Sequence, residues 1–185
     1  MFLMNSILAD GTDSRKFLHM TDSFTLREHR DDDIEWVIRR HGEIYTEEYG
    51  WDHRFQDLVG EIATDFIRDL NPERERCWIA EQEGVRIGCI FLVYKSDDIA
   101  QLRLLLVEPS ARGLGVGSRL VQECIDFAVA HKYSKVRLWT NDVLISARRI
   151  YEAAGFALIE EENHSSWGKP LTSQTWELDL LSSHR

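Results

Sequence analysis

The feature that most constrains the fold is a glycine-rich turn, Arg112-Gly113-Leu114-Gly115-Val116-Gly117. It follows an apolar run at 102–107 and leads into an amphipathic segment at 118–132. Small residues let a backbone turn its N–H groups inward toward a phosphate, and a following helix adds the positive end of its dipole. The pattern therefore predicts a strand, an anion-binding loop and a helix in that order.

Two familiar phosphate motifs do not match this turn. A dinucleotide-binding loop needs a third glycine where Ser118 stands, and a P-loop needs a Gly-Lys-Ser/Thr sequence that is missing here. What is left is the pattern Arg112-x-x-Gly115-x-Gly117 after a strand. A tight strand-to-helix turn that binds nothing is the alternative interpretation.

A second block follows about two dozen residues later. A strand-like run at 135–140 precedes the spaced pattern Asn141, Ala147, Tyr151 and Gly155-Phe156. Together the two blocks resemble the GNAT N-acetyltransferase family, in their order and in their spacing. The resemblance covers roughly residues 24–180 and is strongest over 102–156.

The resemblance implies acetyl-CoA as the donor and an α/β GNAT (acyl-CoA N-acyltransferase) fold, a mixed central sheet with helices on both faces. It also implies which residues meet the donor. Backbone groups of Leu105, Leu106 and Val107 would contact the pantetheine arm, and Asn141 and Ala147 would lie near it. Backbone N–H groups of the turn would hold the pyrophosphate, those of Arg112, Gly113, Leu114, Gly115, Val116, Gly117 and Ser118. Alanine at Gly115 or Gly117 should then block this site through the added Cβ.

Tyr151 is the predicted general acid. Attack by an amine on a thioester releases a thiolate, and a phenol with a pKa of about 10 can donate a hydrogen bond or a proton to it. The alternative is a tyrosine that only packs between helix and sheet. The resemblance therefore predicts direct transfer to a primary amine of a small molecule, an amino acid or a protein.

The general base is harder to identify. Some family members carry a glutamate on the fourth strand, but residues 99–104 contain no carboxylate. Glu81 on the preceding hairpin and the acidic-aromatic segment 43–52 are the remaining candidates. In that segment Tyr45, Tyr49 and Trp51 with Glu48 would suit a cationic acceptor, or would simply pack as a helix link. His164 and Trp167 could close the opposite side.

Apolar periodicity predicts the order β-α-α-β-β-β-α-β-α-β-β. The first helix begins at Asp31-Asp32-Asp33 and runs toward Tyr45, and the second opens at Asp52. The last two strands cover 157–162 and 174–180, and 164–173 is expected to be a loop. We expect one GNAT domain over 23–182, preceded by an extension at 1–22 without a chemical role, because 185 residues suit a single core.

Composition limits the partners. A net charge of −10 disfavours a nucleic-acid surface and slightly favours a cationic acceptor. Cys77, Cys89 and Cys124 show no zinc spacing, so we expect reduced core thiols and no metal. The N-terminal stretch lacks a basic leader and no apolar run reaches membrane length, which predicts a cytoplasmic protein that does not bind membranes. Homodimers are common in the family and are a candidate assembly.

The run 102–117 and the late segment 174–180 resemble most closely the acetyltransferase half of MarR–GNAT fusion proteins. About 22 residues before the first strand cannot hold a helix-turn-helix domain, so DNA binding is not expected. Two functions compete at this point. One is an N-acetyltransferase; the other is an acetyl-CoA-binding sensor or regulatory module with little turnover, which the missing fourth-strand carboxylate keeps open.

Overall fold

The computed structural model describes residues 24–181 and contains a seven-stranded sheet with four α-helices. The extension predicted at 1–22 lies outside the described residues. In chain order the elements are β1 (Thr25–Glu28), α1 (Asp31–Tyr49), α2 (His53–Asp69), β2 (Arg76–Gln82), β3 (Val85–Tyr94), β4 (Ile99–Val107), a 3₁₀ turn η1 (Pro109–Ala111), α3 (Val116–Ala130), β5 (Lys135–Asn141), α4 (Ile145–Ala153), β6 (Ala157–Ser166) and β7 (Lys169–Asp179). This is the order that the sequence predicted.

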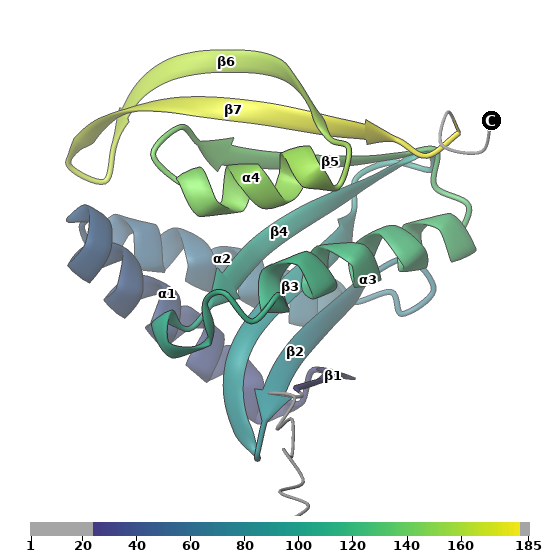
Figure 1. Cartoon of the computed structure of the whole chain (residues 1–185), viewed down its shortest axis with the longest axis horizontal. Coiled ribbons are helices and arrows are strands. Elements are labelled where there is room, and N and C mark those ends of the chain that lie inside the picture. Colours follow the sequence, from purple (N-terminus) through teal and green to yellow (C-terminus); the bar gives the residue numbers. More distant parts are fainter. Residues whose placement is uncertain (1–23, 182–185) are drawn as a thin grey trace, which may run out of the picture.

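The strands lie in the order β1-β2-β3-β4-β5-β7-β6. Strands β4 and β5 pair in parallel, and the other neighbouring pairs of the described sheet are antiparallel. Helices α1 and α2 cover one face of the sheet while α3 and α4 cover the other (Figure 1). The predicted mixed sheet with helices on both faces is confirmed. None of the helices in the described part is long and apolar enough to cross a membrane.

Each face of the sheet has its own core. Beneath α1 and α2, Val37 and Val59 pack with Phe91, and beneath α3, Leu120 and Val121 pack with other fully buried residues. The alternation of side chains along each strand supplies both faces at once. The three cysteines are free and buried, as predicted.

The start of each N-terminal helix follows the sequence signals. Asp33 accepts a hydrogen bond from the Arg30 backbone N–H at 2.6 Å, and Asp52 accepts one from the Arg54 N–H at 3.1 Å. These carboxylates satisfy amide groups that a helix end leaves unpaired. The first helix continues past Tyr45 to Tyr49, where Gly50 ends it in the left-handed conformation at φ 67°.

The segment 164–173 is not a loop, and that prediction was wrong. Strands β6 and β7 form a long hairpin that turns at Trp167-Gly168, with φ values of 52° and 78°. Polar residues without clear alternation hide the strands in the sequence. The hairpin tip contacts the link between α1 and α2. The Asp52 N–H donates to the Trp167 carbonyl at 3.1 Å, and the ring centroids of Trp51 and Trp167 lie 4.5 Å apart.

Strand β4 changes direction in its middle. Its pairing with β3 shifts by one residue between Arg103 and Leu106, and Leu104 adopts a positive φ of 52°. Such a bulge bends a strand and re-aims its backbone. Pairing with β5 stops at Leu102, although both strands continue. The two parallel strands therefore separate, and the functional site lies where they part.

Candidate active site

A cavity of about 450 Å³ lies at the carboxyl end of β4, between α1, the glycine-rich loop and α4. We call it the donor cavity. Leu105, Leu106 and Val107 line one wall, beyond the last β4–β5 pair. Here β4 still pairs with β3 through Leu106 and Val107, but on its other side it has left its parallel neighbour β5, so β5 does not occupy the backbone groups on that side. This wall suits an extended chain that carries its own amides.

The loop geometry is that of an anion cradle. Gly113 and Gly115 have φ values of 83° and 80°, in the left-handed region that side chains disfavour. Gly115 is the residue immediately before α3, whose first turn leaves N–H groups without partners inside the helix. The donor cavity thus ends at a helix N-terminus, which favours a phosphate group.

Gly115 and Gly117 have different surroundings. A Cβ on Gly115 would meet no protein atom within 4 Å, and the positive φ of 80° strains an alanine there. A Cβ on Gly117 would come within 2.6 Å of the Ile150 Cδ1 atom, which is the movable end of a side chain. The two glycines thus differ in the reason for their presence.

Most of the predicted donor contacts line this cavity, namely Leu105, Leu106, Val107, Arg112, Gly113, Gly115, Val116, Gly117, Ser118 and Ala147. Two predicted residues do not. The Leu114 side chain packs against the core beneath α3, and Asn141 lines the neighbouring cavity. Ser146 and Arg149 of α4 line the donor cavity without having been predicted. Arginines are common in helices, so the sequence offered no signal for Arg149.

An ion pair closes one side of the donor cavity. The Glu48 carboxylate lies 2.8 Å from the Arg112 guanidinium and joins α1 to the loop. Both side chains line the cavity, as does Tyr49, so Glu48 and Tyr49 lie beside the donor rather than at the acceptor position predicted for them. In this arrangement the negative charge of Glu48 also offsets the positive charge of Arg112 in the loop.

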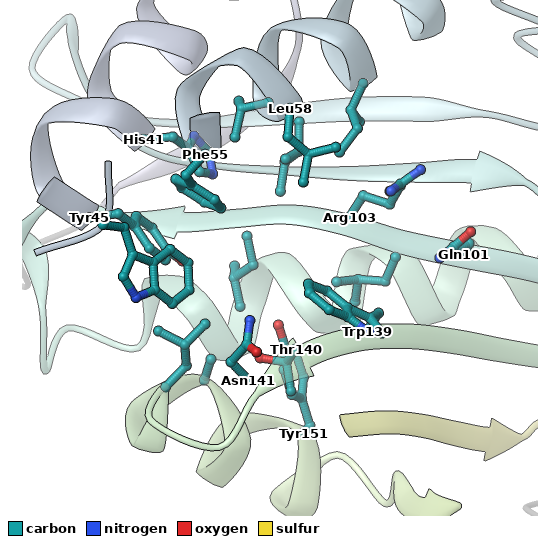
Figure 2. A pocket seen from close by; sticks show the side chains of 18 residues that line it. His41, Tyr45, Phe55, Leu58, Gln101, Arg103, Trp139, Thr140, Asn141 and Tyr151 are labelled. Carbon is teal, nitrogen blue, oxygen red and sulfur yellow. The ribbon is translucent and has the colours of Figure 1, made fainter. Parts of the chain in front are cut away.

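A second cavity, of about 100 Å³, opens between α1, α2 and the separated ends of β4 and β5. We call it the acceptor cavity. Its lining residues come mainly from α1, α2, β4, β5 and α4. Figure 2 shows Phe55 and Leu58 above this cavity and Thr140 and Tyr151 below it. The two cavities share the wall residues Tyr45, Leu105, Leu144 and Ala147. That shared wall is where a group could pass from one cavity to the other.

Tyr151 reaches the acceptor cavity from α4, and its side chain is buried. Among the described residues its hydroxyl has no hydrogen-bond partner. Burial raises the pKa of Tyr151, and the nearby Tyr45 adds to the effect. The phenol therefore stays protonated across the physiological range and is a hydrogen-bond donor in the acceptor cavity.

The aromatic residues of the helix link do not form an open cage. The ring centroids of Tyr45, Tyr49 and Trp51 lie 5.0–5.7 Å from one another, so the rings pack together and leave no space for an ammonium group between them. Gly50 turns the chain so that the Trp51 N–H reaches the Tyr45 carbonyl at 3.3 Å. The three rings thus pack against one another, and Tyr45 and Trp51 also line the acceptor cavity.

Asn141 is held by the β6–β7 hairpin. Its Oδ1 atom lies 2.8 Å from the Nε2 atom of His164, whose Nδ1 atom lies 2.8 Å from the Ser166 hydroxyl. Asn141 is buried and lines the acceptor cavity. His164 thus contacts a residue of this cavity, Asn141, and Trp167 packs against another, Trp51.

His41 is a wall residue that the sequence did not reveal. Its Nδ1 atom lies 2.8 Å from the Val37 carbonyl, which places the proton on Nδ1, and its buried Nε2 atom has no partner among the described residues. Burial lowers the pKa of His41 to about 4. The ring is therefore neutral at pH 7, with an unshared electron pair on Nε2.

Neither cavity offers the predicted base. Glu81 lines neither of them, and its carboxylate accepts a hydrogen bond from the Arg27 Nε atom at 2.8 Å within a network around Asp33. This placement speaks against Glu81. Among the described residues that line the acceptor cavity there is no Asp or Glu, and Arg103 carries the only full charge. The cationic acceptor expected from the net charge is therefore not supported, because total charge says nothing about one cavity.

Comparison with known proteins identifies the architecture. The model of the acetyltransferase (GNAT) family matches residues 19–156. The chain belongs to the GNAT acetyltransferase family. An uncharacterized N-acetyltransferase of Schizosaccharomyces pombe is 30% identical over 136 residues, which cover 72% of this chain and 80% of the relative. Human N-acetylaspartate synthetase is 29% identical over 96 residues, which cover 51% of this chain and 32% of that protein.

Solved structures agree on the fold of this GNAT protein. A GNAT acetyltransferase from Staphylococcus aureus superposes with a TM-score of 0.70 at 22% identity, covering 85% of this chain and 99% of that one. An acetyltransferase from Salmonella typhimurium, solved with its cofactor acetyl-CoA, superposes with a TM-score of 0.69 at 16% identity, covering 85% and 94%. The chain is an N-acetyltransferase that uses acetyl-CoA.

Proposed function

We propose that this enzyme transfers the acetyl group of acetyl-CoA to a primary amine by direct attack in a ternary complex. The observation that carries the proposal is the pair of cavities joined at Tyr45, Leu105, Leu144 and Ala147. A donor in one cavity and an amine in the other would meet at this wall without a covalent enzyme intermediate. Of the described cysteines none lines either cavity, and burial raises the pKa of Cys89, which keeps its thiol protonated.

The proton balance needs one group from the protein. The neutral amine attacks the thioester carbonyl, the C–S bond breaks, and the thiolate accepts a hydrogen bond from Tyr151. The nitrogen sheds one proton as it becomes an amide, and the sulfur gains one, so Tyr151 ends unchanged. Because a free thiol has a pKa of about 8.5, below that of this phenol, hydrogen-bond donation is the main contribution of Tyr151.

The amine must first lose a proton, which at pH 7 costs roughly 4 to 5 kcal/mol for a pKa of about 10.4. No carboxylate is at hand in the described wall of the acceptor cavity. Loss of water lowers an amine's pKa instead, because apolar residues such as Phe55 and Leu58 line this wall.

The acceptor amine belongs to a small molecule, an amino acid or a protein. Several relatives are named N-acetylaspartate synthetase, and this supports an amino acid among the three. The chain covers about a third of those relatives, so the support reaches the catalytic region only.

The proposal is tested by thermal shift and by thiol release. Acetyl-CoA should raise the melting temperature, and a panel of amines should release free thiol in its presence. The absence of a shift at millimolar acetyl-CoA would contradict donor binding. A shift with no thiol release from any amine would instead favour the sensor that the sequence left open.

We also propose a cytoplasmic location and kinship with the acetyltransferase half of MarR–GNAT fusions. Three free, buried thiols are typical of proteins in a reducing compartment. The kinship rests on the runs 102–117 and 174–180.

A further inference from the structure

Charge is distributed unevenly over the two cavities. The donor cavity carries Arg112, Arg149 and Glu48, whereas Arg103 is the one fully charged residue that lines the acceptor cavity in the described part of the chain. The neutral His41 adds no charge at pH 7. A molecule in the acceptor cavity therefore meets a single positive group among mostly apolar walls.

Arg103 is also an arginine without a partner. Arg27 and Arg40 each donate to two carboxylates, and Arg86 donates to Asp33, whereas Arg103 has no hydrogen bond or ion pair among residues 24–181. Burial lowers the pKa of Arg103. The negative charge of Asp65 on α2 raises this pKa in part, by electrostatic attraction without a hydrogen bond. A partly buried guanidinium whose loss of water is not compensated by the protein favours an anionic ligand.

The neighbouring surface extends this positive region. A cavity of about 310 Å³ beside the acceptor cavity is lined by Lys95, Arg103 and Arg137, without an Asp or Glu in the described wall. Arg137 shares its one carboxylate partner, Glu177, with Lys135. Figure 2 shows Arg103 and Gln101 along β4, on the side of the acceptor cavity away from Tyr45. The approach to the site is thus positive, although the whole chain is negative.

From these observations we infer that the acceptor is an amine that also carries a carboxylate, and that Arg103 binds this carboxylate. The inference rests on the proposed transfer reaction and narrows its substrate class to amino acids and similar zwitterions. A planar guanidinium can hold both carboxylate oxygens at once, which orients the molecule with its amine toward the shared wall. A polyamine or another acceptor with only positive charges would be repelled by Arg103.

The experiment compares matched acceptors. Thiol release with acetyl-CoA is measured for glycine against glycinamide, β-alanine against its amide, aspartate against its diamide, and 1,4-diaminobutane. Amino acids should be used with a kcat/KM at least about 10-fold above their amides, since a charged hydrogen-bonded contact is lost in the amide. The diamine should be the poorest acceptor.

Variants assign the effect to the residue. Arg103→Gln should lower kcat/KM for the amino acid roughly 10- to 100-fold and leave the amide within about twofold. Arg103→Lys should recover part of the loss, because it keeps the charge without the planar fork. Arg39→Gln is the matched control, because the exposed Arg39 side chain lines neither cavity. This variant should leave kcat/KM unchanged for both the amino acid and the amide. The acetyl-CoA thermal shift should be the same in all four proteins.

Each outcome decides one of the two claims. Equal use of amino acids and amides, or an equal loss for both in Arg103→Gln, overturns the carboxylate inference and leaves acetyl transfer standing. If no amine releases thiol, the proposed acetyl transfer to these amines is wrong. The thermal shift of the CoA-bound protein is then measured with each amino acid and with its amide. A larger shift with the amino acid supports the inference, and equal shifts overturn it.

Discussion

The donor and acceptor cavities share a wall but are built in different ways. About half of the residues that line the donor cavity come from one contiguous stretch, the end of β4, the loop and the first turn of α3, and several of them are glycines that offer only backbone groups. The acceptor cavity takes side chains from α1, α2, β4, β5 and α4. Backbone in a short motif can bind a constant ligand, whereas scattered side chains can vary with the acceptor. The predictions below test this division.

Tyr151→Phe should give the largest effect. Removal of the Tyr151 hydroxyl from the acceptor cavity should lower kcat by roughly 100- to 10,000-fold, as expected for loss of a group that assists proton transfer. Acetyl-CoA affinity should be unchanged, because Tyr151 does not line the donor cavity. Steady-state kinetics and calorimetric titration measure the two quantities. Tyr94→Phe is the control, since Tyr94 is exposed and lines neither cavity. Activity retained within a few-fold in Tyr151→Phe would contradict this role.

His41 should make the acceptor wall sensitive to acid. Its pKa is about 4 in the folded protein and about 6.5 when unfolded, so below pH 6.5 the unfolded chain binds a proton that the folded chain refuses. Stability should fall as pH drops from 6.5 to 4, by about 3 kcal/mol at most.

Urea unfolding at a series of pH values measures this contribution as the difference between wild type and His41→Leu. The difference should shrink or reverse on going from pH 7 to pH 4, because leucine does not titrate. His53→Leu, which removes an exposed histidine on α2 that lines neither cavity, is measured beside it as the control. A His41→Leu profile parallel to wild type would show that the imidazole is not held neutral.

Gly115→Ala should affect the donor cavity alone. A Cβ at φ 80° costs about 1–2 kcal/mol, which is relieved if the loop leaves its binding conformation, so acetyl-CoA should bind roughly 10-fold more weakly. Gly84→Ala is a close control: Gly84 has φ 79°, nothing lies within 4 Å of its Cβ, and it is in the β2–β3 turn. Both variants should lose similar stability, and only the first should lose affinity. Equal affinities would mean that the loop conformation does not matter for binding.

Glu48→Gln should have the smallest effect. The partly exposed pair with Arg112 contributes less than about 1 kcal/mol, and its removal frees a cation for the phosphates. Acetyl-CoA should bind up to about threefold more tightly at low salt, and the gain should vanish at high salt. Titrations of the neighbouring variant Glu47→Gln should show no gain. Weaker binding in Glu48→Gln would assign the carboxylate a direct part in holding the donor.

Sequence analysis reached the two cavities to different extents. The glycine spacing and the preceding strand predicted about half of the residues that line the donor cavity, because a local conformation such as a left-handed glycine depends on adjacent residues. The second block likewise predicted the position of Tyr151. The acceptor cavity was predicted poorly: Glu81 lies outside it, and His41 and Arg103 went unnoticed. Arg103 could have been noticed as an arginine within an apolar strand. The sequence does not show, however, whether the fold places a carboxylate next to it.

The amino-acid sequence by itself determined the order of the elements, the donor loop and the family, since periodicity and turn chemistry act over a few residues. Tertiary structure decided where β4 leaves β5, how the β6–β7 hairpin reaches the helix link, and which charge faces the acceptor. These depend on a bulge at Leu104 and on contacts such as Trp51 with Trp167, more than a hundred residues apart in the chain. Contacts between distant residues leave no spacing to read, because only the folded chain brings them together.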